Sequence, residues 1–249
     1  FVAVAVFMIL RTHAVLKKRE SQKVSDDEDS ISETDATEEI IDKSSKQVVK
    51  AFAASHQIIS LGIENFLSDN LKGLKKAELK CKEFSKKAKR NKDKAFYNFQ
   101  KLTDGSVDAS HLYVQIMDYK RELAHALNYM LLPMVEHIDN NHKPFTKEQT
   151  VEMNELVVKT ETFLKSLLEM VKREDYNDIE NSITEREQIF KYLDKIEKNQ
   201  IKRIKNKEVN TRNSQLQFKI IAEIRNLLLV SINLVKSQRD FILFTRQSK

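Results

Sequence analysis

The sequence contains few of the residues that form turns, with three Gly and two Pro in 249 residues. A β protein needs many short connections, and Gly and Pro are the residues that most often make them. Trp is absent and Cys81 is the only cysteine, which excludes a disulfide within the chain and a paired-cysteine zinc site. This composition favours an all-α protein of long helices in a reducing compartment, with Cys81 as an unreactive thiol.

The sequence also lacks the common catalytic motifs. We find no glycine-rich phosphate loop, no nucleophile elbow and no His-Glu-x-x-His pattern. The densest polar cluster contains His137 and His142, but it precedes Pro144, where a helix is expected to end. Helix capping and loop hydrogen bonds explain such a cluster better than metal binding or catalysis does. We therefore predict a protein that is not an enzyme and needs no cofactor.

An apolar run, Phe1–Leu10, opens the sequence and is followed by basic residues up to Arg19. Ten helical residues rise about 15 Å, roughly half of a ~30 Å hydrocarbon core. We therefore predict that residues 1–19 are the end of a transmembrane helix and a basic juxtamembrane segment. The positive-inside rule then places the rest at the cytoplasmic face of the inner (plasma) membrane. The alternative is the first helix of a soluble domain, since a signal peptide would carry its positive charges before the apolar run.

Residues 20–43 form an acidic segment. From Glu20 to Asp42 there are ten acidic residues and one lysine, with Ser and Thr between them and few apolar side chains. Such a segment cannot bury enough apolar surface to become ordered, so we predict a flexible linker. From Lys43 onward the chain holds 38 basic and 27 acidic residues. This basic body of about 200 residues is large enough for one domain or two fused halves.

Apolar side chains recur at helical spacing in six stretches of the body. Thr146 and Gln149 form a capping-box pattern at the start of the fourth stretch, and Asn210 is placed to cap the sixth. Pro133 is expected to kink the third stretch. Clusters of Gly, Asn and Asp separate the stretches at Asp69–Gly73, Asp104–Gly105, Asn140–Asn141 and Asp175–Asp178.

The six stretches form an internal repeat. Asp69–Leu74 aligns with Glu174–Ile179 at an offset of 105, and Arg121 aligns with Arg225 at an offset of 104. The identities are few but their order is consistent, as expected for a diverged duplication. We predict a tandem pair of three-helix bundles with a pseudo-twofold relation, with repeats at residues 44–142 and 143–249.

These features resemble the PhoU family. The likeness rests on the two repeats, on the acidic break Glu174–Asp178 and on the Arg-containing helix Tyr119–Asn128. Glu136–Pro144 and Asn199–Phe241 are similar to the PhoU-like cytoplasmic tails of bacterial inorganic phosphate transporters of the PiT or sodium–phosphate cotransporter type. The resemblance implies a PhoU-like fold and a regulatory role in phosphate symport across the membrane. The partner it implies is the transmembrane transporter portion of the same polypeptide.

The metal-binding signature of the PhoU family is absent from this chain. That signature has two carboxylates on one helical face. The resemblance places them at Lys120 and Ala124 in the first repeat, and at Ile224 and Leu228 in the second. None of these residues can supply a carboxylate. Asp118 and Glu122 also share a face and remain as minor metal candidates. The basic residues beside them make surface ion pairs the favoured interpretation.

Two stretches of the body are strongly basic. Lys72–Lys94 holds eleven Lys and Arg against three acidic residues, and Lys191–Lys207 is the corresponding stretch of the second repeat. In a tethered cytoplasmic domain, we expect them to face anionic inner-leaflet lipid or acidic transporter loops. A solvated face without a partner is the alternative, and we expect no nucleic acid because no DNA-binding motif is found. The residues predicted for this surface are Lys75, Lys76, Lys86, Lys87, Lys89, Arg90, Lys202, Arg203 and Lys205.

The sequence thus favours a non-enzymatic, PhoU-like regulatory domain of an inorganic phosphate transporter. A membrane-tethered signalling or scaffold bundle unrelated to phosphate is the alternative from another class. A homodimer is compatible with both.

Overall fold

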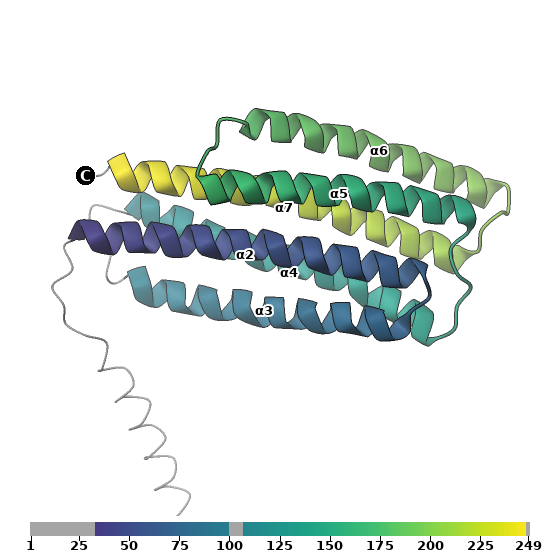
Figure 1. The fold of residues 1–249 in the computed structure, drawn as a ribbon. Coiled ribbons are helices and arrows are strands. Elements are labelled where there is room, and N and C mark those ends of the chain that lie inside the picture. Colours follow the sequence, from purple (N-terminus) through teal and green to yellow (C-terminus); the bar gives the residue numbers. More distant parts are fainter. Residues whose placement is uncertain (1–32, 100–106, 248–249) are drawn as a thin grey trace, which may run out of the picture. The chain divides into compact units, whose positions relative to one another are not determined.

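The computed structural model describes the backbone of residues 33–99 and 107–247. The predictions for residues 1–19, and for most of the linker, lie outside these residues. Within the two ranges all elements are α-helices, so the predicted all-α class is confirmed. Figure 1 shows them in order: α2 (Glu33–Leu67), α3 (Leu71–Phe99), α4 (Val107–Asp139), α5 (Lys147–Arg173), α6 (Ile179–Lys205) and α7 (Thr211–Gln247).

The first of these helices, α2, begins inside the segment that we predicted as a linker, residues 20–43. Ile41 is buried, and it lies two helical turns before the buried Val48, so both side chains face the core. The residues from Glu39 onward belong to one compact unit with the rest of the helical body. The sequence analysis assigned this segment from its charge and overlooked Ile41, which extends the apolar stripe of the helix.

The compact unit consists of two halves of three helices each. The first half contains α2, α3 and α4, and the second half contains α5, α6 and α7 (Figure 1). Helix α4 packs against α3 within its half, α7 packs against α5 and α6, and α4 and α7 pack extensively against each other. The α4–α7 contact therefore joins the halves into a single body.

Both helices of this contact carry buried apolar side chains, and the ring centroids of Tyr113 in α4 and Phe241 in α7 are 5.4 Å apart. Leu123 and Leu127 of α4, and Ile224 and Leu228 of α7, are all fully buried. At roughly 2 kcal/mol for each fully buried Leu or Ile, their burial is a major source of stability. A buried polar contact also joins the halves, because the Gln238 side chain of α7 accepts a hydrogen bond from Ser44 of α2 at 2.7 Å.

The ends of the helices follow the capping signals in the sequence. Thr146 and Gln149 form the predicted capping box, with Gln149 N donating to Thr146 Oγ1 at 3.3 Å and Thr146 N donating to Gln149 Oε1 at 3.0 Å. Asn210 caps α7, because Asn213 N donates to Asn210 Oδ1 at 2.8 Å. Helix α4 continues through Pro133 to Asp139.

We predict that Thr146→Ala lowers the free energy of unfolding by about 1 kcal/mol, because the backbone amide of Gln149 in the first turn of α5 loses its acceptor. Thr162→Ala is the matched control, since Thr162 is exposed in the middle of the same helix and bonds only the Val158 carbonyl. Urea denaturation of both variants measures the difference. Equal effects at the two positions would show that the capping box does not stabilise the fold.

Candidate functional site

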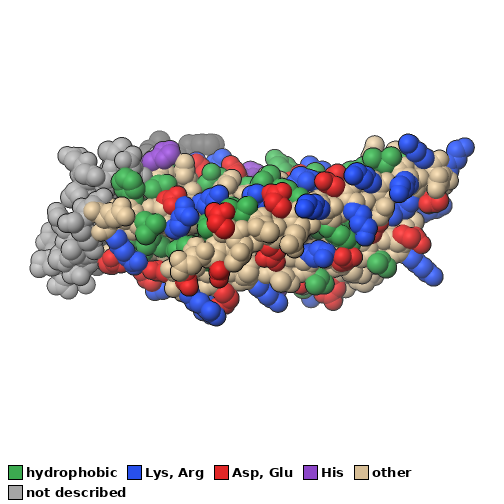
Figure 2. Space-filling view, turned by 90° about the horizontal axis from the view of Figure 1, so that it is seen from above, with side chains coloured by type: hydrophobic (Ala, Val, Ile, Leu, Met, Phe, Trp, Pro, Cys, Tyr) green, Lys and Arg blue, Asp and Glu red, His purple; other side chains and the backbone are tan. Residues whose placement is uncertain are grey.

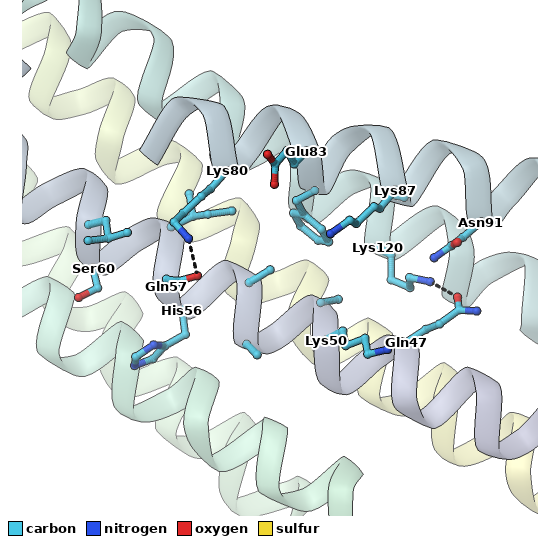
Figure 3. Close-up of a pocket in the computed structure, with 17 residues that line it drawn as sticks. Gln47, Lys50, His56, Gln57, Ser60, Lys80, Glu83, Lys87, Asn91 and Lys120 are labelled. Carbon is cyan, nitrogen blue, oxygen red and sulfur yellow. Dashed lines mark hydrogen bonds between the residues drawn. The ribbon is translucent and has the colours of Figure 1, made fainter. Parts of the chain in front are cut away.

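A groove lies between α2 and α3. It has a volume of about 850 Å³ and reaches down to α4. Figure 3 shows its lining. Part of the wall is apolar, with Ala51, Ile58, Leu61 and Phe84 among the lining residues. We call this feature the α2–α3 groove.

The charge of the α2–α3 groove is strongly one-sided. Its lining contains four lysines and one acidic residue, Glu83. Lys50 comes from α2, Lys80 and Lys87 come from α3, and Lys120 comes from α4. Lys80 donates to the Gln57 side chain at 3.3 Å. Within the described part of the chain none of the four lysines forms an ion pair, and with Glu83 as the acidic residue of the lining the groove carries an excess of positive charge.

Lys120 is the buried member of this set, with 2% of its surface exposed. Figure 3 shows its side chain reaching from α4 toward Gln47 of α2. Its Nζ donates to Gln47 Oε1 at 2.6 Å and lies 3.4 Å from Met117 Sδ. Burial lowers the pKa of Lys120 from 10.5 to about 7, because the charged ammonium loses its hydration. A buried cation with neutral partners alone is costly to the fold.

The sequence analysis did not identify Lys120 as a site residue, although the signal was present. Lys120 lies four residues after Ile116 and three before Leu123, and both of these are buried. It therefore occupies the core face of α4. In the repeat alignment it corresponds to Ile224, which is fully buried in the second half. In the predicted alignment the first half thus has a lysine where the second half has an ordinary core residue.

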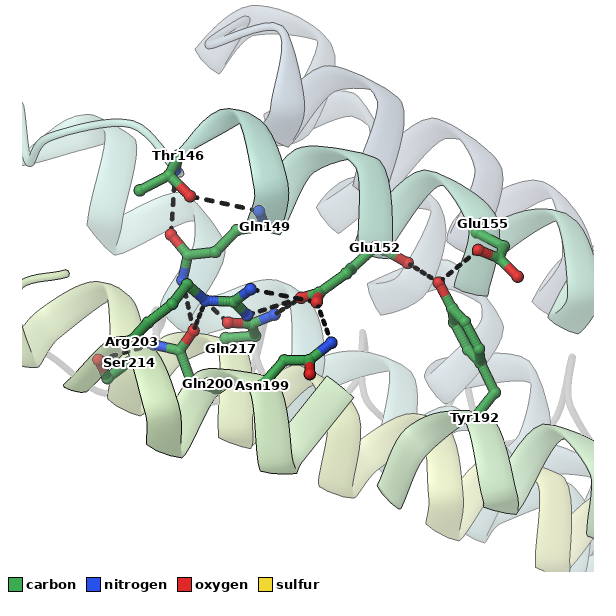
Figure 4. A network of polar contacts seen from close by, with 10 residues as sticks. All are labelled: Thr146, Gln149, Glu152, Glu155, Tyr192, Asn199, Gln200, Arg203, Ser214 and Gln217. Carbon is green, nitrogen blue, oxygen red and sulfur yellow. Dashed lines mark hydrogen bonds and ion pairs between the residues drawn. The ribbon is translucent and has the colours of Figure 1, made fainter. Parts of the chain in front are cut away.

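The second half contains a different polar centre, built around an ion pair between Glu152 and Arg203 (Figure 4). Arg203 Nη1 and Nη2 donate to the two carboxylate oxygens of Glu152 at 3.1 and 2.6 Å, a bidentate arrangement. Arg203 Nε donates to Gln200 Oε1 at 2.8 Å. The two charges therefore neutralise each other within the protein.

Amide side chains complete this network. Gln149 donates to Gln217 at 2.9 Å, and Gln200 donates to Ser214 at 2.8 Å. Asn199 adds a third bond to the Glu152 carboxylate, at 2.9 Å. Each charged group is matched inside the protein, so the network ties α5, α6 and α7 together. We interpret it as a structural element, in contrast with the open charge of the α2–α3 groove.

Arg203 therefore corrects one of our predicted surface residues. It is 8% exposed and is held by Glu152, so it cannot contact a membrane. The reason is its helical register, since Arg203 follows the buried Ile196 and Gln200 on the same face of α6. The other predicted residues are exposed, and they are Lys75, Lys76, Lys86, Lys87, Lys89, Arg90, Lys202 and Lys205.

The two basic helices lie on opposite sides of the compact unit. Figure 1 shows α3 along the lower edge and α6 along the upper edge, and each packs against helices of its own half. Figure 2 shows many Lys and Arg side chains toward the right end of the molecule. Lys202 and Lys205, in the last turn of α6, are exposed. A single flat surface cannot contact both helices along their length. Contact of α3 with a partner and contact of α6 with a partner must therefore be tested separately.

The minor metal candidates do not form a ligand set with other groups. Asp118 forms an ion pair with Lys92 of α3 at 2.5 Å, which is the kind of pairing that we favoured for it. Glu122 is exposed. Among the residues that the structure describes, no group of three or more His, Cys, Asp or Glu side chains is placed to hold a metal ion.

The histidine cluster and the cysteine have structural surroundings. His137 is buried, its ring packs against Phe66, and its Nε2 lies 3.0 Å from the Lys143 carbonyl oxygen. This contact closes the loop after α4, as we expected of a helix end.

Cys81 is fully buried, and burial raises the pKa of its thiol to about 11. A thiol with that pKa is a poor nucleophile near neutral pH.

Comparison with known proteins supports the fold. No family model and no curated protein sequence matches the chain. A solved structure that matches is the phosphate transport system regulatory protein PhoU from Streptococcus pneumoniae, with a TM-score of 0.68. The match has 11% sequence identity and covers 83% of this chain and 96% of that chain. At this identity the likeness establishes a PhoU-like fold.

We predict that Arg203→Ala lowers the free energy of unfolding by about 3 kcal/mol, because it leaves the Glu152 carboxylate without its partner. Lys202→Ala is the control, since Lys202 is the exposed neighbour on the same helix. It should change stability by less than about 0.5 kcal/mol. Similar effects of the two substitutions in thermal or urea unfolding would contradict the buried ion pair.

Lys120→Met should have the opposite effect and stabilise the chain at neutral pH by more than about 1 kcal/mol. The pKa of Lys120 is lowered in the folded state, so between about pH 7 and 10 the unfolded chain binds more protons than the folded chain. The penalty is therefore full below pH 7 and fades as the pH rises. Urea denaturation at about pH 7 and pH 9 should show the advantage of the variant shrinking. A variant that is less stable at both pH values would contradict an uncompensated Lys120.

Proposed function

We propose that this chain is a regulatory domain of inorganic phosphate uptake and has no enzymatic activity of its own. The observation that carries the proposal is the match of its two three-helix halves to a phosphate transport regulatory protein, over 83% of this chain. The residues that resemble the PhoU-like tails of phosphate transporters point in the same direction. The duplicated helical body would act by contact with a transporter.

We further propose that the partner is the transmembrane portion of a PiT or sodium–phosphate cotransporter, joined to this domain through the residues that precede Glu39. The apolar run Phe1–Leu10 supports this attachment, although it lies outside the described residues. None of the helices within the described ranges is long and apolar enough to cross a membrane. The domain would then lie at the cytoplasmic face of the inner membrane, with α3 or α6 turned toward the transporter or the anionic lipid around it.

The expected result of deleting residues 44–249 in the source cell is the loss of phosphate-dependent control of uptake. Radiolabelled phosphate uptake would be measured in phosphate-replete and phosphate-starved cells. In unaltered cells the two rates differ, and in the deletion strain the difference should disappear. Restoring the deleted residues should restore the difference.

Uptake of radiolabelled sulfate serves as the control, because a general membrane defect would alter both ions. An unchanged ratio of replete to starved phosphate uptake would overturn the proposal. That outcome would favour the alternative, a membrane-tethered helical scaffold with no link to phosphate.

A further inference from the structure

We propose that the α2–α3 groove is a binding site for a multivalent phosphate-bearing anion, with Lys120 at its floor and Lys50, Lys80 and Lys87 on its walls. This inference goes beyond the proposed function, because it rests on the groove itself and holds whether or not the chain regulates phosphate uptake. It shares Lys87 with the predicted membrane surface, and it differs from that surface because the buried Lys120 lies at its floor.

The first step is the unmet hydrogen-bonding and charge requirement of Lys120. An ammonium group has three N–H donors, and the contacts of Lys120 are Gln47 Oε1 and Met117 Sδ. Both partners are neutral, and thioether sulfur is a weak acceptor. An anion in the groove could take the remaining donor and supply the missing negative charge. Charge-assisted hydrogen bonds of this kind are about twice as strong as neutral ones.

The second step is the number of cations around one cavity. Lys50, Lys80 and Lys87 line the same groove as Lys120, and Glu83 is the acidic residue that opposes them. A single carboxylate would balance one of these charges, whereas a group with several phosphates would balance most of them. Lysine acts as a point charge and is a common phosphate ligand in proteins. The four lysines should therefore bind an anion with several phosphates more tightly than an anion with one negative charge.

The third step is the size and apolar wall of the groove. Its volume of about 850 Å³ is within the range of small-molecule sites, which is about 300–1,000 Å³. Phe84 and Ile58 line it beside the lysines. Phosphates could therefore contact the lysines while an organic portion contacts the apolar wall. Two sources share this chemistry, a soluble phosphate compound and the headgroup of an acidic phospholipid.

The fourth step comes from the internal repeat. The second half folds with Ile224 at the position that corresponds to Lys120. A buried lysine is therefore not needed to build this three-helix arrangement, and it destabilises the half that contains it. Residues that cost stability without serving the fold are typical of functional sites. The buried charge is explained if a ligand neutralises it.

The test is isothermal titration calorimetry of the 249-residue chain with tripolyphosphate as the probe. We expect one site per chain. Lys120→Met should weaken binding about ten-fold or more, which is the loss expected for one charge-assisted contact. Lys87→Gln, on the exposed wall, should also weaken it. Lys202→Gln is the control, because Lys202 is an exposed lysine on α6 far along the sequence from the groove, and it should change affinity less than two-fold.

Vesicle flotation distinguishes the two sources of phosphate. If the ligand is a lipid headgroup, the chain should bind vesicles that contain cardiolipin, whose headgroup carries two phosphates, but not vesicles of phosphatidylcholine alone, and Lys120→Met should abolish that binding. If the ligand is soluble, tripolyphosphate binding should depend on Lys120 while vesicle binding does not. Circular dichroism checks that each variant is folded.

Two results would overturn the proposal. One is the absence of binding to both probes at low salt. The other is equal weakening by Lys120→Met and Lys202→Gln, which would indicate a diffuse attraction to a basic protein. Lys120→Met is expected to be more stable than the unaltered chain, so unfolding would not account for its loss of binding.

Discussion

The packing of α4 against α7 is the contact on which the rest of the structure depends. It includes the ring contact between Tyr113 and Phe241, and it joins two halves that each contain three helices. Because α4 is fixed at the centre, its core face determines what lies beneath α2 and α3. That face carries Lys120, so the same packing that forms the core also holds a cation under the α2–α3 groove.

The two halves differ in whether their buried charges have a partner of opposite charge. In the second half the Arg203 guanidinium meets the Glu152 carboxylate, and amide side chains satisfy the atoms around them. In the first half Lys120 meets the neutral Gln47. A closed network adds stability and specificity to the fold, whereas an open charge costs stability and attracts an anion. The second half thus has a closed polar network, whereas the first half has a buried cation with neutral partners.

Much of the fold could be predicted from the sequence because its signals are local. The scarcity of Gly and Pro indicated long helices, and the Thr146 capping box and the Asn210 cap lie where the pattern placed them. Arg203 was predicted to be exposed because of its charge, and Lys120 was not predicted as a site residue. Both residues lie on the apolar stripe of their helix, so helical register would have indicated their burial. The groove itself depends on how α2, α3 and α4 pack together, which local spacing does not specify.

The most direct test of this account is the titration of Lys120 itself by nuclear magnetic resonance, with the lysine side chains labelled with nitrogen-15. The Lys120 signal would be assigned by its loss in the Lys120→Met variant. The account predicts that its pKa is near 7 in the free chain and rises when tripolyphosphate is added, because a bound anion stabilises the ammonium. A pKa near 10.5 that does not respond to tripolyphosphate would contradict the account.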